Sequence, residues 1–165
     1  MDFAGPFLVK IMRRLQLKHY VAIFSCMLYR AVHLELVEGL SADQFKMAFA
    51  RFTARRGRPG QVNSDNGSNL KAGEIELLEE RAKLDVEELR KLYPEITWHF
   101  NTPTAAHQGG HFERKVGAMK EALYQMVDYP GEALKREELA TLLAEAEAVM
   151  NLQPLVHPST NMADC

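Results

Sequence analysis

The pattern of apolar and polar residues divides the chain into short strands and amphipathic helices. Residues 20–29 are apolar on both faces, which is typical of a strand buried on both sides. From Val32 onward, apolar residues alternate with polar ones that include His33 and Glu35. This period of two predicts a strand with one exposed face. Further strand-like segments are expected at residues 2–6, 60–64 and 96–100.

Helices are predicted where apolar residues recur every three to four positions. The first should begin at Ser41, because Ser41 and Gln44 form a capping-box pattern, and it should end where Gly57 and Pro59 interrupt the chain. Its buried face is expected to carry Phe45, Ala48, Phe49 and Phe52. Further helices are expected within residues 71–92, from about residue 110, and over residues 135–152. This order of elements predicts an α/β layer architecture with a mixed sheet.

Length and composition favour one domain inside the cell. The chain has 165 residues, 47% of them hydrophobic, and no Pro/Gly-rich linker marks a boundary. No apolar run approaches the roughly 18 residues of a membrane span, so no membrane association is expected. The two cysteines, Cys26 and Cys165, cannot make a disulfide framework or a zinc cluster, which fits a reducing compartment.

Charge is distributed unevenly along the chain. Residues 1–60 contain ten Lys and Arg against four Asp and Glu, whereas the remainder contains ten against eighteen. A basic half can follow a phosphate backbone. A solvated surface of mixed charge explains the same counts equally well, so charge alone does not identify a partner.

Three acidic residues lie where regular elements are expected to begin or end. Asp2 begins a strand-like segment, Asp65 follows a short strand and precedes Asn-Gly, and Glu113 lies near the start of a helix after two glycines. Carboxylates are ligands that Mg²⁺ and Mn²⁺ favour, and three acids from separate elements suffice for a two-metal site. Lys120, two helical turns beyond Glu113, could contact a phosphate near such a site.

Each of these residues also has an ordinary structural explanation. Asp65 before Asn-Gly can be a turn residue, and Glu113 can complement the dipole of its helix. Asp2 can be exposed near a chain end, and Lys120 can be a solvated helix lysine. The functional interpretation therefore depends on the three acids being taken together.

Taken together, the acidic segments resemble those of a known family. Asp2-Phe-Ala-Gly-Pro-Phe, Ser64-Asp-Asn-Gly and the segment Ala-His-Gln-Gly-Gly-His-Phe-Glu at 106–113 are similar to the three acidic motifs of retroviral and retrotransposon integrase cores. The resemblance is greatest to the integrase region of Pao/BEL-type polyproteins. It spans essentially the whole chain, residues 1–165, which are interpreted as one integrase catalytic core from a longer polyprotein.

The resemblance implies a fold, a site and partners. The fold would be ribonuclease H-like, with a mixed five-stranded sheet flanked by helices and a truncated first strand that leaves Asp2 at a frayed end. Two Mg²⁺ or Mn²⁺ ions would be held by Asp2, Asp65 and Glu113. DNA would be contacted by Asn66, Gln108 and Lys120. The implied partners are retroelement ends, target DNA and further copies of the chain, with activity in the nucleus.

Three functions follow from this resemblance. The first is a metal-dependent polynucleotidyl transferase that processes DNA 3′ ends and joins them to target DNA. The second is a ribonuclease H-type nuclease on the same fold. The third is a catalytically impaired or host-adopted module that binds nucleic acid or assembles with partners. Fold alone does not choose among them.

Overall fold

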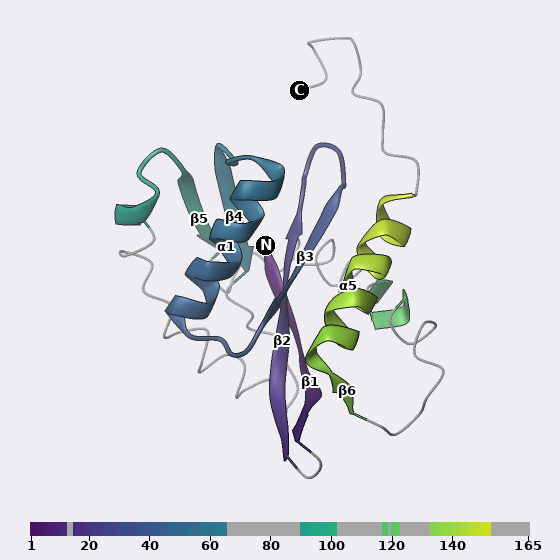
Figure 1. Ribbon diagram of the computed structural model, residues 1–165. Helices are drawn as coiled ribbons and strands as arrows, with labels where there is room; N and C mark the ends of the chain where they lie inside the picture. The colour runs from purple at the N-terminus through teal and green to yellow at the C-terminus, as the bar shows by residue number, and fades with distance from the viewer. Residues whose placement is uncertain (13–14, 66–89, 102–116, 119, 123–132, 153–165) are drawn as a thin grey trace.

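The computed structural model describes residues 1–12, 15–65, 90–101, 117–118, 120–122 and 133–152 (Figure 1). Six strands and two long helices are assigned within these ranges. In chain order they are β1 (Asp2–Met12), β2 (Leu15–Ser25), β3 (Val32–Val37), α1 (Ala42–Arg56), β4 (Gln61–Asp65), β5 (Thr97–Asn101), β6 (Leu134–Lys135) and α5 (Arg136–Asn151). The protein is therefore a mixed α/β structure, as the sequence predicts.

The strands form two sheets in the described part of the chain. One has four strands in the order β3-β2-β1-β6, with β1 antiparallel to β2 and parallel to β6, and the other pairs β4 with β5 in parallel. The predicted five-stranded sheet is therefore not confirmed. The two sheets nevertheless meet, because the backbone nitrogen of Met1 donates to the carbonyl oxygen of Asn63 in β4.

The start of β1 is paired. Asp2 lies opposite Ile23 in the antiparallel ladder with β2, so the expectation that Asp2 hangs from a frayed end is wrong. The apolar run predicted as a strand to residue 29 ends earlier, at Ser25. Residues 26–29 instead form an exposed turn, which the Cys26 amide closes by donating to the carbonyl of Ala31 at 2.8 Å.

Two apolar clusters lie on opposite faces of the four-stranded sheet. One packs α1 and the β4–β5 pair, including Trp98 of β5, against residues such as Phe3 and Phe24. The other packs α5 against residues such as Ala4 and Ile23. Alternate residues of β1 thus enter different clusters, as the period of two in a strand requires. β1 and β2 are therefore central elements between two helical layers (Figure 1).

Helix α1 confirms the prediction made from its sequence. Ser41 is its N-cap, and its side chain accepts a hydrogen bond from the Gln44 amide at 3.4 Å. The Gln44 side chain accepts from the Glu38 amide at 3.4 Å and not from the Ser41 amide, so the predicted capping box is only half formed in the described structure. Gly57 ends the helix with a φ of 86°, a conformation that favours glycine. Three of the four predicted face residues are buried and Phe52 is partly buried against them.

The expectation that β3 has an exposed polar face is wrong. His33 and Glu35 are both only 5% exposed. The alternating pattern shows that one face of the strand is polar. Whether water or protein covers that face depends on elements elsewhere in the chain. Here the polar face is covered by α1, whose arginines supply partners for Glu35.

The structure describes only part of the other helices that the sequence predicts. Most of the predicted 71–92 helical region lies outside the described residues, as does most of the helix expected from residue 110, of which residues 117–118 and 120–122 are helical. The predicted 135–152 helix is confirmed as α5. Among the helices in the described ranges, none is both long enough and apolar enough to cross a bilayer.

Candidate functional site

Two of the three predicted acids come from neighbouring strands. Asp2 is the first residue of β1, and Asp65 is the last residue of β4. The bond between the Met1 nitrogen and the Asn63 carbonyl places the start of β1 beside the end of β4. Asp2 follows Met1 directly, and Asp65 lies two residues beyond Asn63. The fold thus brings Met1 and Asn63, which are 62 residues apart in sequence, into contact beside the strand positions of Asp2 and Asp65.

Asp2 is held by its local backbone. The side chain is half-buried, and its Oδ1 accepts a hydrogen bond from the Phe3 amide at 2.7 Å. Because Phe3 belongs to the α1 cluster and Ala4 to the α5 cluster, Asp2 shares the α5 face of the sheet with Ala4. The Asp65 backbone is fixed by pairing with Asn101 of β5.

Lys120 lies on the same side of the sheet. It is half-buried in the helical residues 120–122, and Ala122 packs in the cluster that contains Ala4. Lys120 therefore belongs to a segment that packs in the α5 cluster, and its contact with a phosphate remains a prediction.

The other predicted site residues lie outside the described part of the chain: Asn66, Gln108 and Glu113. Within the described ranges, no group of three or more His, Cys, Asp or Glu side chains is arranged to hold a metal ion. The expected third ligand, Glu113, therefore remains a prediction, as does its convergence with Asp2 and Asp65.

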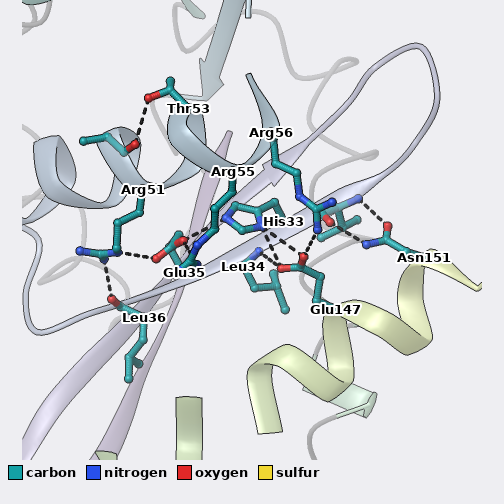
Figure 2. Close-up of polar contacts among 12 residues, drawn as sticks. His33, Leu34, Glu35, Leu36, Arg51, Thr53, Arg55, Arg56, Glu147 and Asn151 are labelled. Atoms are coloured by element: carbon teal, nitrogen blue, oxygen red, sulfur yellow. Dashed lines mark hydrogen bonds and ion pairs between the residues drawn. The ribbon is translucent and has the colours of Figure 1, made fainter. Parts of the chain in front are cut away.

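A second polar site is a buried charge cluster that joins α1, β3 and α5 (Figure 2). Both ring nitrogens of His33 contact carboxylates, with Nε2 3.0 Å from Glu35 and Nδ1 3.0 Å from Glu147 of α5. Glu35 also receives Arg51 Nε and Arg55 Nη1, each at 2.6 Å. The members of this cluster are His33, Glu35, Arg51, Arg55, Arg56 and Glu147, where Arg56 pairs with Glu147.

The geometry requires a protonated His33. A neutral imidazole has one donor and one acceptor nitrogen, yet here both nitrogens face carboxylate oxygens. Burial lowers the pKa of His33, but hydrogen bonds to Glu147 and Glu35 outweigh burial and raise it above 6.5. Burial likewise raises the pKa of each carboxylate, but hydrogen bonds from His33 and other donors leave both below 4.5.

Side chains from both helices also close the outer edge of β3. Asn151 accepts from the Val32 amide and donates to the Val32 carbonyl, each at 2.8 Å. Glu147 accepts from the Leu34 amide at 2.7 Å, and Arg51 donates to the Leu36 carbonyl at 3.1 Å. These side chains take the place of a neighbouring strand, so the edge of the four-stranded sheet is covered.

The solved structures that match this fold include a viral intasome and two forms of an integrase catalytic core domain. A chain of the simian T-cell lymphotropic virus intasome, solved with a PP2A regulatory subunit, superposes on 96% of this chain with a TM-score of 0.64 and 16% identity. The magnesium-bound catalytic core domain of HTLV-2 integrase superposes on 96% in a trimeric form, with a TM-score of 0.58 and 19% identity. The dimeric form of the same domain superposes on 88% of this chain, with a TM-score of 0.56 and 18% identity.

The fold is that of integrase catalytic cores. This chain spans 49% of the matched intasome chain, but 86% and 83% of the two HTLV-2 core chains. No protein-family model matches the sequence, and no curated protein matches it significantly. The ribonuclease H-like architecture expected from the acidic motifs is therefore supported by the fold, while a Pao/BEL origin is not.

Within this integrase-core fold, the charge cluster serves as scaffold. Each of its carboxylates is bound by cations and donors, which leaves little capacity to take up a proton from a substrate or to hold a metal ion. Sequence reasoning missed the cluster because His33 and Glu147 are 114 residues apart. The available signal was local: three arginines close the helix that follows a strand containing His and Glu.

The cluster predicts a stability maximum in mildly acidic solution. Glu35 and Glu147 have lowered pKa values in the folded state, so their stabilisation is present above about pH 4.5 and is lost as pH falls below it. His33 has a raised pKa, so its stabilisation is complete below about pH 6.5 and is lost as pH rises through its folded value. Denaturant unfolding from pH 3 to 9 should therefore be most resistant near about pH 5–6.5.

The His33→Gln variant tests the alkaline side of this profile. It should remove the decline above about pH 6.5, because glutamine does not titrate. The matched control is His99→Gln, since His99 is exposed on β5 and should leave the profile unchanged. If the His33→Gln variant still loses stability above about pH 6.5, that loss belongs to another titrating group.

Proposed function

We propose that this chain is the catalytic core of a retrotransposon integrase, a metal-dependent polynucleotidyl transferase that processes DNA 3′ ends and joins them to target DNA. The observation that carries the proposal is the placement of Asp2 and Asp65 on neighbouring strands of an integrase-core fold. The backbone contact between Met1 and Asn63 lies beside these two acids, and the solved structures that share the fold include HTLV-2 integrase core domains in complex with magnesium.

The donor chemistry fits magnesium. Asp2 and Asp65 supply hard carboxylate oxygens, and the proposal adds Glu113 as the third ligand. When bound at these carboxylates, a divalent ion would stabilise negative charge on phosphate oxygens and lower the pKa of a bound water or hydroxyl. Mn²⁺ favours the same oxygen ligands and is expected to substitute.

The protein's own residues would position the reacting groups. The β1–β2 ladder fixes the Asp2 backbone, and the bond from the Phe3 amide restricts its carboxylate. Lys120 would contact a phosphate of the donor strand, while Asn66 and Gln108 would support the DNA end. In the first step water attacks a phosphorus atom and frees a 3′-hydroxyl; in the second, that hydroxyl attacks the target phosphorus and displaces a bridging oxygen.

The proposal extends to source, partners and location. Similarity of the segments at 2–7, 64–67 and 106–113 to Pao/BEL integrase motifs supports a retrotransposon of that type. The proposed partners are the retroelement's DNA ends, target DNA and further copies of this chain, in the nucleus. Self-association is supported by the dimeric and trimeric forms of the HTLV-2 core.

The test is cleavage and joining of an end-labelled DNA duplex by the purified chain in Mg²⁺ or Mn²⁺. The proposal expects shortened and joined products that appear with either ion and disappear with a chelator. The Asp65→Asn variant is the control and should yield neither product. Equal product from wild type and Asp65→Asn would refute a catalytic role for this site.

A parallel assay separates the two alternatives. A ribonuclease H-type enzyme would cleave the RNA strand of an RNA–DNA hybrid in preference to duplex DNA. A binding or assembly module would retain DNA in a mobility-shift assay without cleaving it in either metal. An integrase core is expected to cleave and join duplex DNA and to leave the hybrid largely intact.

A further inference from the structure

The outer half of the β1–β2 hairpin continues beyond the strand that covers its inner half. β3 pairs with residues 20–25 of β2, whereas residues 15–19 of β2 pair with β1 alone. In Figure 1 these two strands extend downward past α1 and past the start of α5. Among the strands that the structure describes, none lies beside residues 15–19 on the side away from β1. This stretch of backbone, residues 15–19, is the open edge of β2.

The open edge separates apolar from polar side chains. Along β2, the buried odd-numbered apolar residues enter the α5 cluster and the buried even-numbered ones enter the α1 cluster. The same alternation places Leu15 and Leu17 on the α5 face, and Gln16 and Lys18 on the α1 face. The register with β1 agrees, since Leu17 lies opposite Val9, a member of the α5 cluster. A strand added here would therefore meet apolar side chains on one face and polar or cationic ones on the other.

The apolar side chains of this half of the hairpin are exposed. Leu15 and Leu17 are 45% and 47% exposed, and Met12, which lies opposite Leu15, is 67% exposed. Contiguous exposed aliphatic side chains mark interaction surfaces, and the edge of a sheet is a template for a further strand. The two features together indicate a partner that is itself a polypeptide strand.

The charge of this region indicates which kind of strand. Between Asp2 and Glu35 the sequence contains five Lys and Arg and no acidic residue. Two of these cations, Lys10 and Lys18, lie on the α1 face of the hairpin, where Lys10 is opposite Gln16. An acidic strand complements this charge, whereas a second copy of the same hairpin brings a like charge against it. A nucleic-acid backbone would match the cations but would leave the exposed leucines without an apolar partner.

We propose that the open edge of β2 binds an extended segment of a partner polypeptide in which apolar and acidic residues alternate. The segment would add to the four-stranded sheet as a short strand beside residues 15–19. Its apolar side chains would lie beside Leu15 and Leu17, and its acidic side chains beside Gln16 and Lys18. Main-chain hydrogen bonds would give affinity, and the alternate side chains would give specificity.

The test is titration of the ¹⁵N-labelled full chain with the blocked peptide Ac-Val-Glu-Val-Glu-Val-NH₂, without DNA or metal. This peptide reads the same in both directions, so its valines can lie opposite residues 15, 17 and 19 in either strand orientation. Saturable amide shifts and slowed hydrogen exchange should be confined to residues 15–19 and their contacts in β1.

Methylation of the peptide backbone tests for strand pairing directly. A strand on one edge directs only every second backbone N–H group toward that edge. One peptide is methylated on the nitrogens of both glutamates, and another on those of the second and third valines. One of the two should bind at least about ten-fold more weakly than the parent peptide, and the other within about three-fold of it.

Gln16 supplies a matched pair of variants, because it is exposed on the α1 face of the open edge. Gln16→Lys should strengthen binding of the Val/Glu peptide by about two- to five-fold, and Gln16→Glu should weaken it to a similar extent. Both effects should reverse with Ac-Val-Lys-Val-Lys-Val-NH₂. The thermal midpoint of each variant checks that the fold is retained.

Several results would overturn the proposal. Equal affinities of the two methylated peptides would exclude pairing through one edge, and so would peptide shifts centred on the helices or an absence of binding at millimolar peptide. Shifts of residues 15–19 that follow protein concentration without peptide would assign the edge to a second copy instead. Duplex DNA that saturates the same amides at about 0.15 M salt would assign it to nucleic acid. Because the peptide assay contains neither DNA nor metal, its result is independent of catalytic activity.

Discussion

Asp2→Asn is expected to lower the rate of metal-dependent DNA cleavage and joining by at least about 1,000-fold, a loss of roughly 4 kcal/mol of transition-state stabilisation. The amide removes a negative charge and a strong oxygen ligand from the proposed metal site. It keeps an Oδ1 atom, which can still accept the bond from the Phe3 amide at 2.7 Å. The fold should therefore be retained while activity is lost. Single-turnover rates on a labelled duplex measure the effect.

The control for this variant is Asp43→Asn in the first turn of α1. Asp43 is 87% exposed and its pairing with Lys46 at 3.4 Å is a surface contact. The same chemical change there should leave the rate within about two-fold, since nothing near the proposed site is altered. A loss in Asp2→Asn of less than about ten-fold would remove Asp2 from the metal-binding set. Circular dichroism on both variants separates loss of chemistry from loss of fold.

The double variant Arg51→Met, Arg55→Met is expected to lower the free energy of unfolding by about 3 kcal/mol. Both guanidinium groups contact Glu35 at 2.6 Å, and Glu35 is only 5% exposed. Without them, His33 is the one cationic partner left to this buried carboxylate among the described residues. His33 limits the loss to the lower end of the range for breaking a buried ion pair.

A third substitution shows whether the lost stability comes from an uncompensated buried charge or from lost side-chain packing. Adding Glu35→Met to the double variant should recover at least about half of the lost stability, because no charge is then left uncompensated. Arg136→Met is the surface control. Its partner Glu38 is 55% exposed, so the change should cost less than about 0.5 kcal/mol. Strictly additive effects of the three cluster substitutions in urea unfolding would contradict the account.

Features of this structure that depend on residues close together in sequence can be predicted, whereas features that depend on distant residues cannot. Helix α1 is predicted from end to end because its cap at Ser41, its apolar period and its stop at Gly57 are local signals. The burial of His33 is not predictable from β3 alone. It requires Phe52 of α1 at a ring distance of 5.7 Å and Glu147 of α5, 114 residues away.

The candidate site likewise has features that the sequence predicts and features that it does not. The sequence pattern predicted that Asp2 begins a strand and that Asp65 ends one, and the structure assigns both residues these positions. The convergence of their carboxylates with Glu113 remains a prediction. The division of the sheet into two parts was not predictable. It depends on how far the pairing between β1 and β4 extends, and a strand's own residues do not report how much of each edge is paired.

The covered edge of β3 bears on how copies of this chain can meet. Most exposed edge strands are templates on which a second sheet can grow. Here Asn151, Glu147 and Arg51 satisfy the outward backbone groups of Val32, Leu34 and Leu36. Continuous sheets across two molecules at this edge would first have to break those bonds. Copies of this core that meet at the β3 edge would therefore use the helical surfaces beside it, and the polar helix residues there disfavour fibre-like stacking through this edge.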